Sequence, residues 1–596
     1  MALKRARWLI PEPPAEEIAA LARSAGISLP TARIFWKREI RDAAAVQQFL
    51  HPRLEDLHSP FELADMRVAA DRLARAVRNN EKVLLYGDYD VDGTSSIVIL
   101  HTALRIAGAD VSYHVPHRIR EGYGMRSEVV EQAKADGIGL IVSVDTGIRA
   151  SAVVEHARAL GIDVIVTDHH LPEGDLPPAI AVLNPNRRDC RYPAKNLCGA
   201  AVAWKLAAGL LHVLGWAEAR REKLLTSLLK LVAIATVADV VPLTGENRIL
   251  VRHGLEGLRE NTNHGLRAIL KVAGIKEGEA PSARQVGFQI GPRLNAAGRM
   301  DDARDVIDLF LTQDAARAGQ LAEKLDLLNK ERQETEAQIR EQIIAECSAV
   351  AITDADAGLV FSAAGWHQGV IGIVAGRLVE RYSRPVFVLS EDPETGEAHG
   401  SGRGPAMFHL LDAMESMPEL FSRFGGHRQA AGLKMKVAHV AEFRERFAAY
   451  AALRLGPDDL RPVHDCDTAV TLEELTDETV AEIFALAPFG NANPVPLLAL
   501  RGAYVARSPE VKNEKHLFLH LRHGETTRVA KGWSMAEFAG DHRAGDRVDA
   551  AVLLEEDSWA KQRGGSFWGL VLKDCRAAEQ MAAGVSDPVR TGADRS

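Results

Sequence analysis

The spacing of apolar and polar residues changes along the chain, and each change of spacing marks a new region. Residues 1–75 carry the three- and four-residue spacing of helices. Over residues 76–310, short apolar runs alternate with helical stretches, and residues 201–260 are mostly helical in pattern. The runs typical of strands lie at residues 82–87, 111–116, 139–144, 163–168 and 179–184. Strands that alternate with helices predict βαβ units and a mostly parallel sheet.

A long helix is predicted over residues 311–348. From Gln320 to Ser348 the chain contains neither Gly nor Pro. One face at helical spacing carries Leu321, Leu325, Leu328, Arg332, Thr335, Ile339 and Ile343. At roughly 1.5 Å per residue such a helix spans about 40 Å, so we interpret it as a connector between two domains.

Two further domains are predicted after this connector. Residues 349–455 repeat the α/β pattern on a smaller scale. Residues 456–576 are rich in short strands with charged turns, which favours a small OB-like β-barrel. Residues 577–596 are small and polar, and we expect a disordered tail.

The composition agrees with a multidomain globular protein. Of 596 residues, 46% are hydrophobic and 26% are charged, which excludes a disordered or collagen-like chain. No stretch has the roughly 18 to 20 apolar residues that a membrane helix needs, and no signal peptide is recognised. The 5 cysteines are scattered and never form CxxC, so a reducing cytoplasm is expected. The net charge of -9 implies that any nucleic-acid binding uses local patches.

Acidic residues follow the first predicted strand directly. Asp88, Asp90 and Asp92 stand at alternate positions where the strand ends and a helix begins. Such carboxylates repel one another unless a cation lies between them. A calcium loop of the EF-hand type is excluded, because the twelfth position counted from Asp88 is Ile99 instead of Glu.

Similar residues follow other predicted strands. Asp145 follows the strand at 139–144, and Asp168, His169 and His170 follow the strand at 163–167. Carboxyl ends of parallel strands share one edge, so we expect these side chains to converge. Asp239 adds a further acid where an apolar helix stops before Pro242. A single such Asp is most often a helix cap or turn former. The whole set instead favours Mn²⁺ or Mg²⁺, with Zn²⁺ less suited, and two-metal phosphoester hydrolysis.

These motifs resemble the DHH phosphoesterase family, named for the triplet at Asp168, His169 and His170. The sequences GDYDVDG, SVDTG, TDHH and TVADVVPL stand in the order of the family's four motifs. The likeness runs over residues 60–575 and includes GPRLNAAGRM, WHQGVIG, GSGR, FGGH and PFGNANP. It implies a parallel-sheet DHH phosphoesterase domain, a DHH-associated domain and an OB domain. The usual form of the last motif has Gly at Ala492, so that turn is expected to differ slightly.

The resemblance also implies roles for individual residues. It assigns the metal ligands to Asp90, Asp92, Asp145, His169 and Asp239. It leaves Asp88, Asp168 and His170 to orient these ligands or to contact phosphate. Substrate binding is expected at Arg118, Arg299, Ser401, Arg403 and His427, where glycine-rich turns and arginines can hold a phosphate. Without the resemblance, flexible surface turns and solvated arginines are the alternative. In the barrel, the candidates for strand binding are Lys512, Lys515, His516, Arg528, Lys531, Trp533, Trp559 and Lys561.

The function implied by the resemblance is a metal-dependent 5′-to-3′ exonuclease. It would hydrolyse single-stranded DNA to mononucleotides in recombination and repair. A single-strand-binding protein and a RecQ-type helicase are the implied partners, and a monomer without membrane contact is expected. Two alternatives stay open: a small-substrate phosphodiesterase of the same family, acting on oligoribonucleotides or cyclic dinucleotides, and a non-catalytic replication scaffold.

Overall fold

The computed structural model describes residues 6–118, 120–349, 352–353, 356–557 and 566–578. Its contacts divide the chain into two units, which we treat separately. Among the described residues, the first comprises residues 52–461 with 488–494, and the second comprises residues 6–51, 462–487 and 495–578. In the described residues, no helix is long and apolar enough to cross a membrane. The domain boundaries proposed from the sequence stay a prediction.

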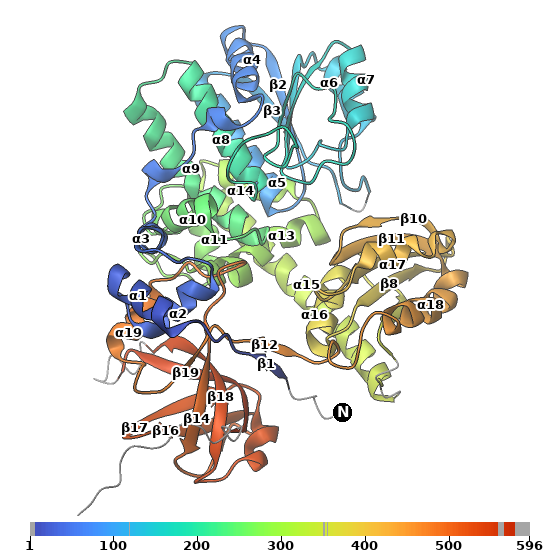
Figure 1. The fold of residues 1–596 in the computed structure, drawn as a ribbon. Coiled ribbons are helices and arrows are strands. Elements are labelled where there is room, and N and C mark those ends of the chain that lie inside the picture. The colour runs from blue at the N-terminus through green and yellow to red at the C-terminus, as the bar shows by residue number, and fades with distance from the viewer. Residues whose placement is uncertain (1–5, 119, 350–351, 354–355, 558–565, 579–596) are drawn as a thin grey trace, which may run out of the picture. The chain divides into compact units, whose positions relative to one another are not determined.

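The first unit begins with the predicted parallel sheet (Figure 1). Its strands lie in the order β3-β2-β4-β5-β6, and every neighbouring pair is parallel. The bounds are β2 Lys82–Gly87, β3 Asp110–His114, β4 Leu140–Val144, β5 Asp163–Thr167 and β6 Ala181–Leu183. All five predicted strands are therefore present.

Alternation along each strand feeds two hydrophobic cores. Val83 and Leu85 pack into the core that contains α4, α5 and α8, whereas Leu84 and Tyr86 pack with α6 and α7. In Figure 1, α6 and α7 lie on one side of the sheet and α4 and α8 on the other. The bounds are α4 Met66–Arg78, α5 Val91–Ala107, α6 Ser127–Ala135, α7 Ser151–Ala159 and α8 Gly199–Val213, preceded by η1 Leu54–Asp56 and η2 Pro60–Glu62. Trp204 of α8 lies in the first of these two cores.

A helical region completes this part of the unit. Its elements are α9 Glu218–Ala238, α10 Gly245–Gly257, α11 His264–Val272, α12 Ala283–Gln285, η3 Val286–Ile290, α13 Gly291–Met300, α14 Arg304–Leu311 and α15 Ala315–Ala349. The long helix α15 confirms the predicted connector, and Leu325 and Ile343 of its predicted face are fully buried.

The second sheet of this unit has the order β10-β11-β9-β8-β7, with only β7 and β8 parallel. Its elements are β7 Leu359–Ala364, α16 Ile371–Tyr382, β8 Val386–Asp392, β9 Glu397–Arg403, α17 Leu410–Glu415, η4 Pro418–Leu420, β10 Phe421–Gly426, β11 Ala430–Lys436, η5 Val437–His439 and α18 Val440–Ala452. These strands and helices confirm the smaller α/β pattern predicted for this region.

The glycines of this sheet correct one prediction. Ser401 and Arg403 were expected on a glycine-rich turn, but residues 400–403 lie inside the central strand β9. Packing explains the glycines, since a Cβ at Gly402 would lie 2.4 Å from the Phe387 ring. Gly425 and Gly426 likewise belong to β10, and His427 follows that strand.

The second unit contains the predicted OB-like barrel. Strands β14, β18, β19, β17 and β16 form a closed circuit, because β14 also pairs with β16. Its strands are β12 Val463–Asp465, β13 Thr468–Val470, β14 Leu497–Val505, β15 Glu510–Lys512, β16 His516–His523, β17 Thr526–Gly532, β18 Arg547–Glu556 and β19 Trp568–Ala577, with helices α19 Asp477–Phe484 and η6 Ala536–Asp541.

The N-terminal helices belong to this second unit. They are α1 Ala15–Ala25, α2 Leu29–Lys37 and α3 Ala43–Leu50. Strand β1, Arg7–Leu9, pairs in parallel with β12, and Arg33 of α2 donates to the carbonyl of Ala469. The N-terminal segment therefore packs against β12 and β13, the strands that precede the barrel. Its local helical pattern does not reveal this long-range arrangement.

Candidate metal centre and phosphate-binding residues

The turn from β2 into α5 is built around backbone hydrogen bonds to Asp90. As the N-cap of α5, its carboxylate accepts from the amides of Asp92 at 2.9 Å and Gly93 at 3.0 Å. A Cβ at Gly93 would lie 2.5 Å from the Asp88 carbonyl oxygen, so only glycine fits this tight turn. The turn thereby directs Asp88, Asp90 and Asp92 to one edge of the sheet.

Asp92 is anchored by the start of α8. Its two carboxylate oxygens accept from the amides of Gly199 at 2.6 Å and Ala200 at 2.8 Å. Free amides and the helix dipole at a helix N-terminus both stabilise a negative charge. These bonds fix the orientation of a carboxylate that is only 1% exposed.

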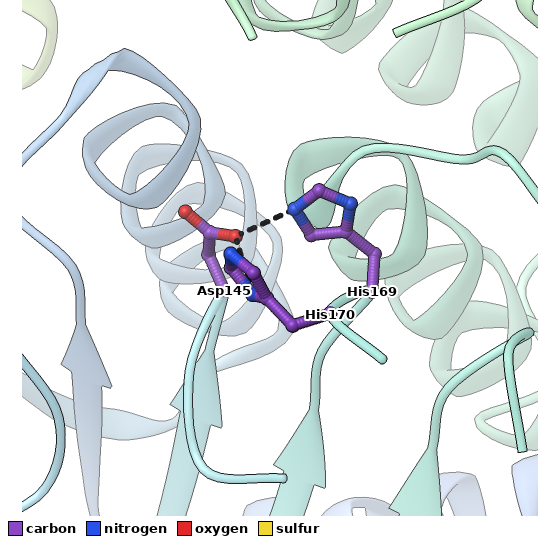
Figure 2. Close-up of side chains that lie close together, drawn as sticks. All are labelled: Asp145, His169 and His170. Carbon is purple, nitrogen blue, oxygen red and sulfur yellow. Dashed lines mark ion pairs between the residues drawn. The ribbon is translucent and has the colours of Figure 1, made fainter. Parts of the chain in front are cut away.

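Asp145 and His169 lie at the centre of the predicted cluster. Asp145 follows β4 with a left-handed φ of 57°, which turns its side chain toward the neighbouring strand ends. Nε2 of His169 lies 3.1 Å from Asp145 Oδ1, 3.5 Å from Asp92 Oδ2 and 3.6 Å from Asp239 Oδ2. Figure 2 shows the imidazoles of His169 and His170 on the same carboxylate of Asp145. The predicted convergence of these strand ends is thus present.

Ligand atoms within this cluster form three overlapping groups. In each group the candidate atoms lie within 4.8 Å of one another. The groups are Asp88 with Asp90 and Asp145, Asp92 with His169 and Asp239, and Asp145 with His169 and His170. Asp88, which the resemblance gave a supporting role, thus lies where a ligand could lie.

Asp168 is a different kind of carboxylate, because hydrogen bonds surround it. It accepts from the amides of Ile148, His169 and His170 at 2.9, 2.7 and 3.1 Å, and it lies 2.7 Å from His170 Nδ1. Burial alone would raise the pKa of Asp168, but these hydrogen bonds hold it below its usual value. For His170 the two effects are reversed. Burial lowers the pKa of its ring, but the hydrogen bond and the charge of Asp168 outweigh burial, so the pKa is raised. This geometry suits the predicted orienting role of Asp168.

Three other carboxylates, those of Asp88, Asp145 and Asp239, receive too little such compensation. Burial and neighbouring carboxylates raise the pKa of Asp88 and Asp145 well above the usual range and that of Asp239 to about 9. Within the described chain, Asp88 Oδ1 is buried without a hydrogen-bond partner, and the buried Asp145 Oδ1 makes no hydrogen bond although the rings of His169 and His170 lie near it. Buried oxygens with no donor and mutual repulsion are what a cation relieves. Carboxylates with imidazole and no thiolate ligand therefore fit Mn²⁺ or Mg²⁺.

The predicted substrate arginines form a basic group near this centre. The Arg118 guanidinium lies 4.8 Å from the centre of the Tyr89 ring, and Arg299 Nη1 donates to the Gly369 carbonyl at 3.0 Å. Burial, then Arg118, Arg332 and Arg403, lower the pKa of Arg299 to about 10. Burial and Arg118 also lower the pKa of Arg403. Cations this close to one another are suited to an anion.

Ser401 and Arg403 share a narrow space beside α16. Arg403 Nη1 donates to Ser401 Oγ at 3.2 Å, and a Cβ at Gly372 would lie 2.8 Å from that hydroxyl oxygen. His427 keeps an exposed surface. Partial burial of its ring and the charge of Arg149 lower its pKa, and His170 makes a smaller contribution. The structure therefore brings this predicted residue within electrostatic range of the DHH triplet.

The residues predicted to bind the strand in the barrel have different surroundings in the structure. The ammonium of Lys512 lies 4.4 Å from the Phe518 ring centre, and His516 stacks edge-on against the half-exposed Trp533. Lys531 instead pairs with Glu555 at 2.9 Å and Asp557 at 3.1 Å, and Arg528 covers Trp568. Lys515 lies in the turn before β16, at the Lys512 end. Trp559 and Lys561 lie outside the described residues.

Sequence reasoning missed polar residues that contact the triplet. Asn184 Nδ2 donates to the His170 carbonyl at 2.8 Å, and Asn186 Nδ2 donates to the His169 carbonyl at 2.6 Å. The Tyr123 hydroxyl lies 3.3 Å from His170 Nδ1. Both asparagines follow β6, so the strand-end argument could have found them, whereas nothing in the sequence marks Tyr123.

Three family models match the chain in the expected order. The model described as DHH family, N-terminal domain, matches residues 82–236. The DHHA1 domain matches residues 356–453, and the RecJ OB domain matches residues 466–567. The two sheets and the barrel thus each correspond to one known domain.

Similar proteins cover almost the whole chain. The single-stranded-DNA-specific exonuclease RecJ of Bacillus subtilis is 35% identical over 97% of this chain and 72% of its own length. That of Escherichia coli is 37% identical over 81% of this chain and 85% of its own length. The crystal structure of Thermus thermophilus RecJ with Mn²⁺ has 30% identity and a TM-score of 0.81, covering 98% of this chain and 81% of that one. Its Mg²⁺ complex has 29% identity and a TM-score of 0.75, covering 98% and 80%.

Proposed function

Because this chain belongs to the RecJ family of single-stranded-DNA-specific exonucleases, we propose that it degrades single-stranded DNA from the 5′ end to mononucleotides. The single observation that carries the proposal is the cluster in which His169 lies within 3.6 Å of Asp92, Asp145 and Asp239. Bound Mn²⁺ or Mg²⁺ supplies hydroxide and neutralises phosphate charge in such a centre.

The chain's own residues supply binding and orientation. We assign ion binding to Asp90, Asp92, Asp145, His169 and Asp239, with Asp88 close enough to contribute. Asp168 fixes the His170 ring through Nδ1 and raises the pKa of that ring, which favours the protonated form that suits a phosphate oxygen.

The basic group is assigned to the 5′ end of the strand. Arg118, Arg299 and Arg403 are mutually close cations, and Ser401 adds a hydroxyl beside them. Guanidinium groups bind phosphate oxygens in a fork, so these residues can hold a terminal phosphate while His427 contacts a neighbouring one. Strand binding beyond this point is assigned to the barrel, where Trp533 and the Lys512 ammonium offer stacking and charge.

The alternatives are less well supported. A small-substrate phosphodiesterase has no use for a RecJ-type OB domain, and a scaffold has no need for the complete set of carboxylate and imidazole ligands. We further propose that the protein acts as a cytoplasmic monomer in recombination and repair, with a single-strand-binding protein and a RecQ-type helicase as partners. The unpaired cysteines support a reducing compartment, and the partners rest on the family resemblance alone.

The test is digestion of a 5′-phosphorylated, 3′-labelled single strand with Mn²⁺, beside its blunt duplex and a dinucleotide. We expect rapid release of mononucleotides from the 5′ end and little attack on the duplex. Cleavage confined to the dinucleotide would support the small-substrate alternative. Binding without cleavage would support the scaffold.

A further inference from the structure

One loop connects β6 to α8 and contacts the candidate metal centre at both of its ends. We call residues 184–200, which are this loop together with the first two residues of α8, the brace loop. At its start, the side-chain amide of Asn184 donates to the His170 carbonyl and that of Asn186 donates to the His169 carbonyl. Asn184 is fully buried, and its Oδ1 accepts from the Asn186 amide at 2.7 Å. The two asparagines therefore hold the backbone of both histidines.

The far end of the brace loop meets the carboxylates. Directly after Cys198, the amides of Gly199 and Ala200 bind both oxygens of Asp92. A Cβ at Gly199 would lie 2.7 Å from the Asp145 Cβ, so the loop end packs against that side chain. Residues on three strand ends thus depend on one segment.

The middle of the brace loop is pinned by charged and amide groups that do not touch the centre. Lys195 Nζ donates to the carbonyls of Pro185 at 2.9 Å and Cys190 at 2.6 Å. Asn247 Nδ2 donates to the carbonyl of Asn196 at 2.6 Å and to that of Pro242, in the turn after Asp239, at 3.0 Å. The loop is therefore linked to the Asp239 segment as well.

We propose that the brace loop is a positioning element that sets the affinity of the centre for Mn²⁺ or Mg²⁺, with Asn184 and Asn186 as its main positioning residues. Metal sites depend on polar groups behind the ligands, because these fix the direction of the ligand atoms. Here the groups hold the backbone of the histidines instead of their rings. This inference rests on the metal-dependent function proposed above.

The experiment compares Asn184→Ala and Asn186→Ala with Asn263→Ala in the full-length protein. Asn263 is a matched control, since its Nδ2 donates to the Phe310 carbonyl and its Oδ1 accepts from the Leu266 amide, both at 2.8 Å, away from the cluster. Mn²⁺ binding is measured by calorimetry without DNA, and the melting temperature is measured in EDTA. We expect about 10- to 100-fold weaker Mn²⁺ binding in the first two variants and unchanged binding in the control.

Two further variants separate positioning from folding. Asn186→Gln keeps the amide donor and is expected to recover most of the affinity lost in Asn186→Ala. The ammonium of Lys195 donates only to carbonyls of the loop itself. Lys195→Met is therefore expected to weaken Mn²⁺ binding by a smaller factor. Lys82→Met is its control, because Lys82 likewise donates from its ammonium to a backbone carbonyl, that of Asp136, outside the centre.

The outcomes distinguish this inference from the proposed function. If the unmodified protein binds no Mn²⁺, the metal-dependent function itself is wrong. If it binds Mn²⁺ and a folded Asn186→Ala variant binds equally well, the positioning role is wrong. Equal losses in Asn186→Ala and Asn263→Ala would also overturn it, since general destabilisation would then explain both.

Discussion

The acidic centre at the ends of β2, β4 and β5 and the basic group around Arg299 and Arg403 carry opposite charges but share one property. In the acidic centre, burial and like charges raise the pKa of Asp88, Asp145 and Asp239. In the basic group, burial and like charges lower the pKa of Arg299 and Arg403. Each region therefore concentrates one sign of charge at an energetic cost that its own residues do not offset.

A buried pair elsewhere in the first unit shows the ordinary arrangement. Lys205 and Glu246 are both buried, lie 2.5 Å apart, and share hydrogen bonds with the His58 carbonyl and the Tyr192 hydroxyl. There each charge has its partner within the chain. The difference teaches that the acidic centre and the basic group are arranged for charges that arrive from outside, namely cations and phosphate.

The largest expected effect is at Asp145. Asparagine keeps the size and tolerates the left-handed φ of 57°, but it removes the charge. We expect Asp145→Asn to lower kcat by at least about 10²-fold, since loss of even one group that stabilises developing charge costs roughly 10²–10³. Binding of single-stranded DNA should change little, and the melting temperature in EDTA should rise because a repulsive buried charge is gone.

The opposite result for Asp145→Asn would contradict the view that the acidic centre is arranged for a cation. A variant that melts lower than the unmodified protein in EDTA would mean that the carboxylates are satisfied without a cation. Retained turnover in metal-stripped and re-metallated protein would remove Asp145 from the ligand set.

The basic group is tested by Arg403→Met. Loss of a charge-assisted hydrogen bond costs roughly 1.5–3 kcal/mol, so we expect KM for a 5′-phosphorylated strand to rise about 10- to 100-fold, with a smaller change in kcat. The preference for a 5′-phosphate over a 5′-hydroxyl strand should shrink by a similar factor. Arg446→Met is the control, because Arg446 pairs with Glu419 and Glu442 on the surface of α18. An unchanged preference in Arg403→Met would contradict the assignment.

Asp239 gives a pH-dependent test of the acidic centre. Its pKa is raised from 3.8 to about 9, so the metal-free folded state holds a proton that the unfolded state releases. Stability from this group is therefore fully present below about pH 4 and is lost as the pH rises toward 9. Asp239→Asn is neutral throughout, so in EDTA its melting temperature should exceed that of the unmodified protein increasingly from pH 5 to pH 9.

Linkage limits the growth of that difference to about 1.4 kcal/mol of unfolding free energy per pH unit. Saturating Mn²⁺ should reverse the order of the two proteins, because only the unmodified chain keeps the carboxylate. A difference that stays constant with pH would show that Asp239 is ionised without a metal.

Much of the fold and of the acidic centre follows from the sequence, because the end of a strand can be recognised from a short apolar run and the residues directly after it. The five parallel strands and the convergence of Asp88, Asp145 and His169 follow from short apolar runs that end in acids, and the long α15 follows from helical spacing without Gly or Pro. The assignment to the DHH family is confirmed by the matching family model and by RecJ relatives that cover most of the chain. Which residues act as ligands and which contact substrate stays a prediction.

The sequence failed where tertiary packing decides. Glycines at residues 400–402 suggested a turn, yet they belong to β9 because Phe387 and Leu433 occupy the space of their missing side chains. The pairing of β1 with β12 joins residues more than 450 positions apart, which no local pattern encodes. The triplet's contact with Tyr123 is likewise a product of loop placement.

The smallest expected effect isolates backbone strain from charge. Ala492 has a φ of 58°, almost the same as Asp145, but it carries no charge. Its neighbour Asn491 accepts from the Leu243 amide at 2.8 Å and donates to the Val240 carbonyl at 2.7 Å, next to Asp239. Glycine removes the left-handed penalty of about 1–2 kcal/mol but adds freedom to the unfolded chain, so Ala492→Gly should gain roughly 0.5–1 kcal/mol in denaturant unfolding. Unchanged kcat would show that strain beside Asp239 contributes nothing to turnover, leaving charge alone to explain the Asp145 variant, whereas a loss of kcat would make the rigid turn part of the centre.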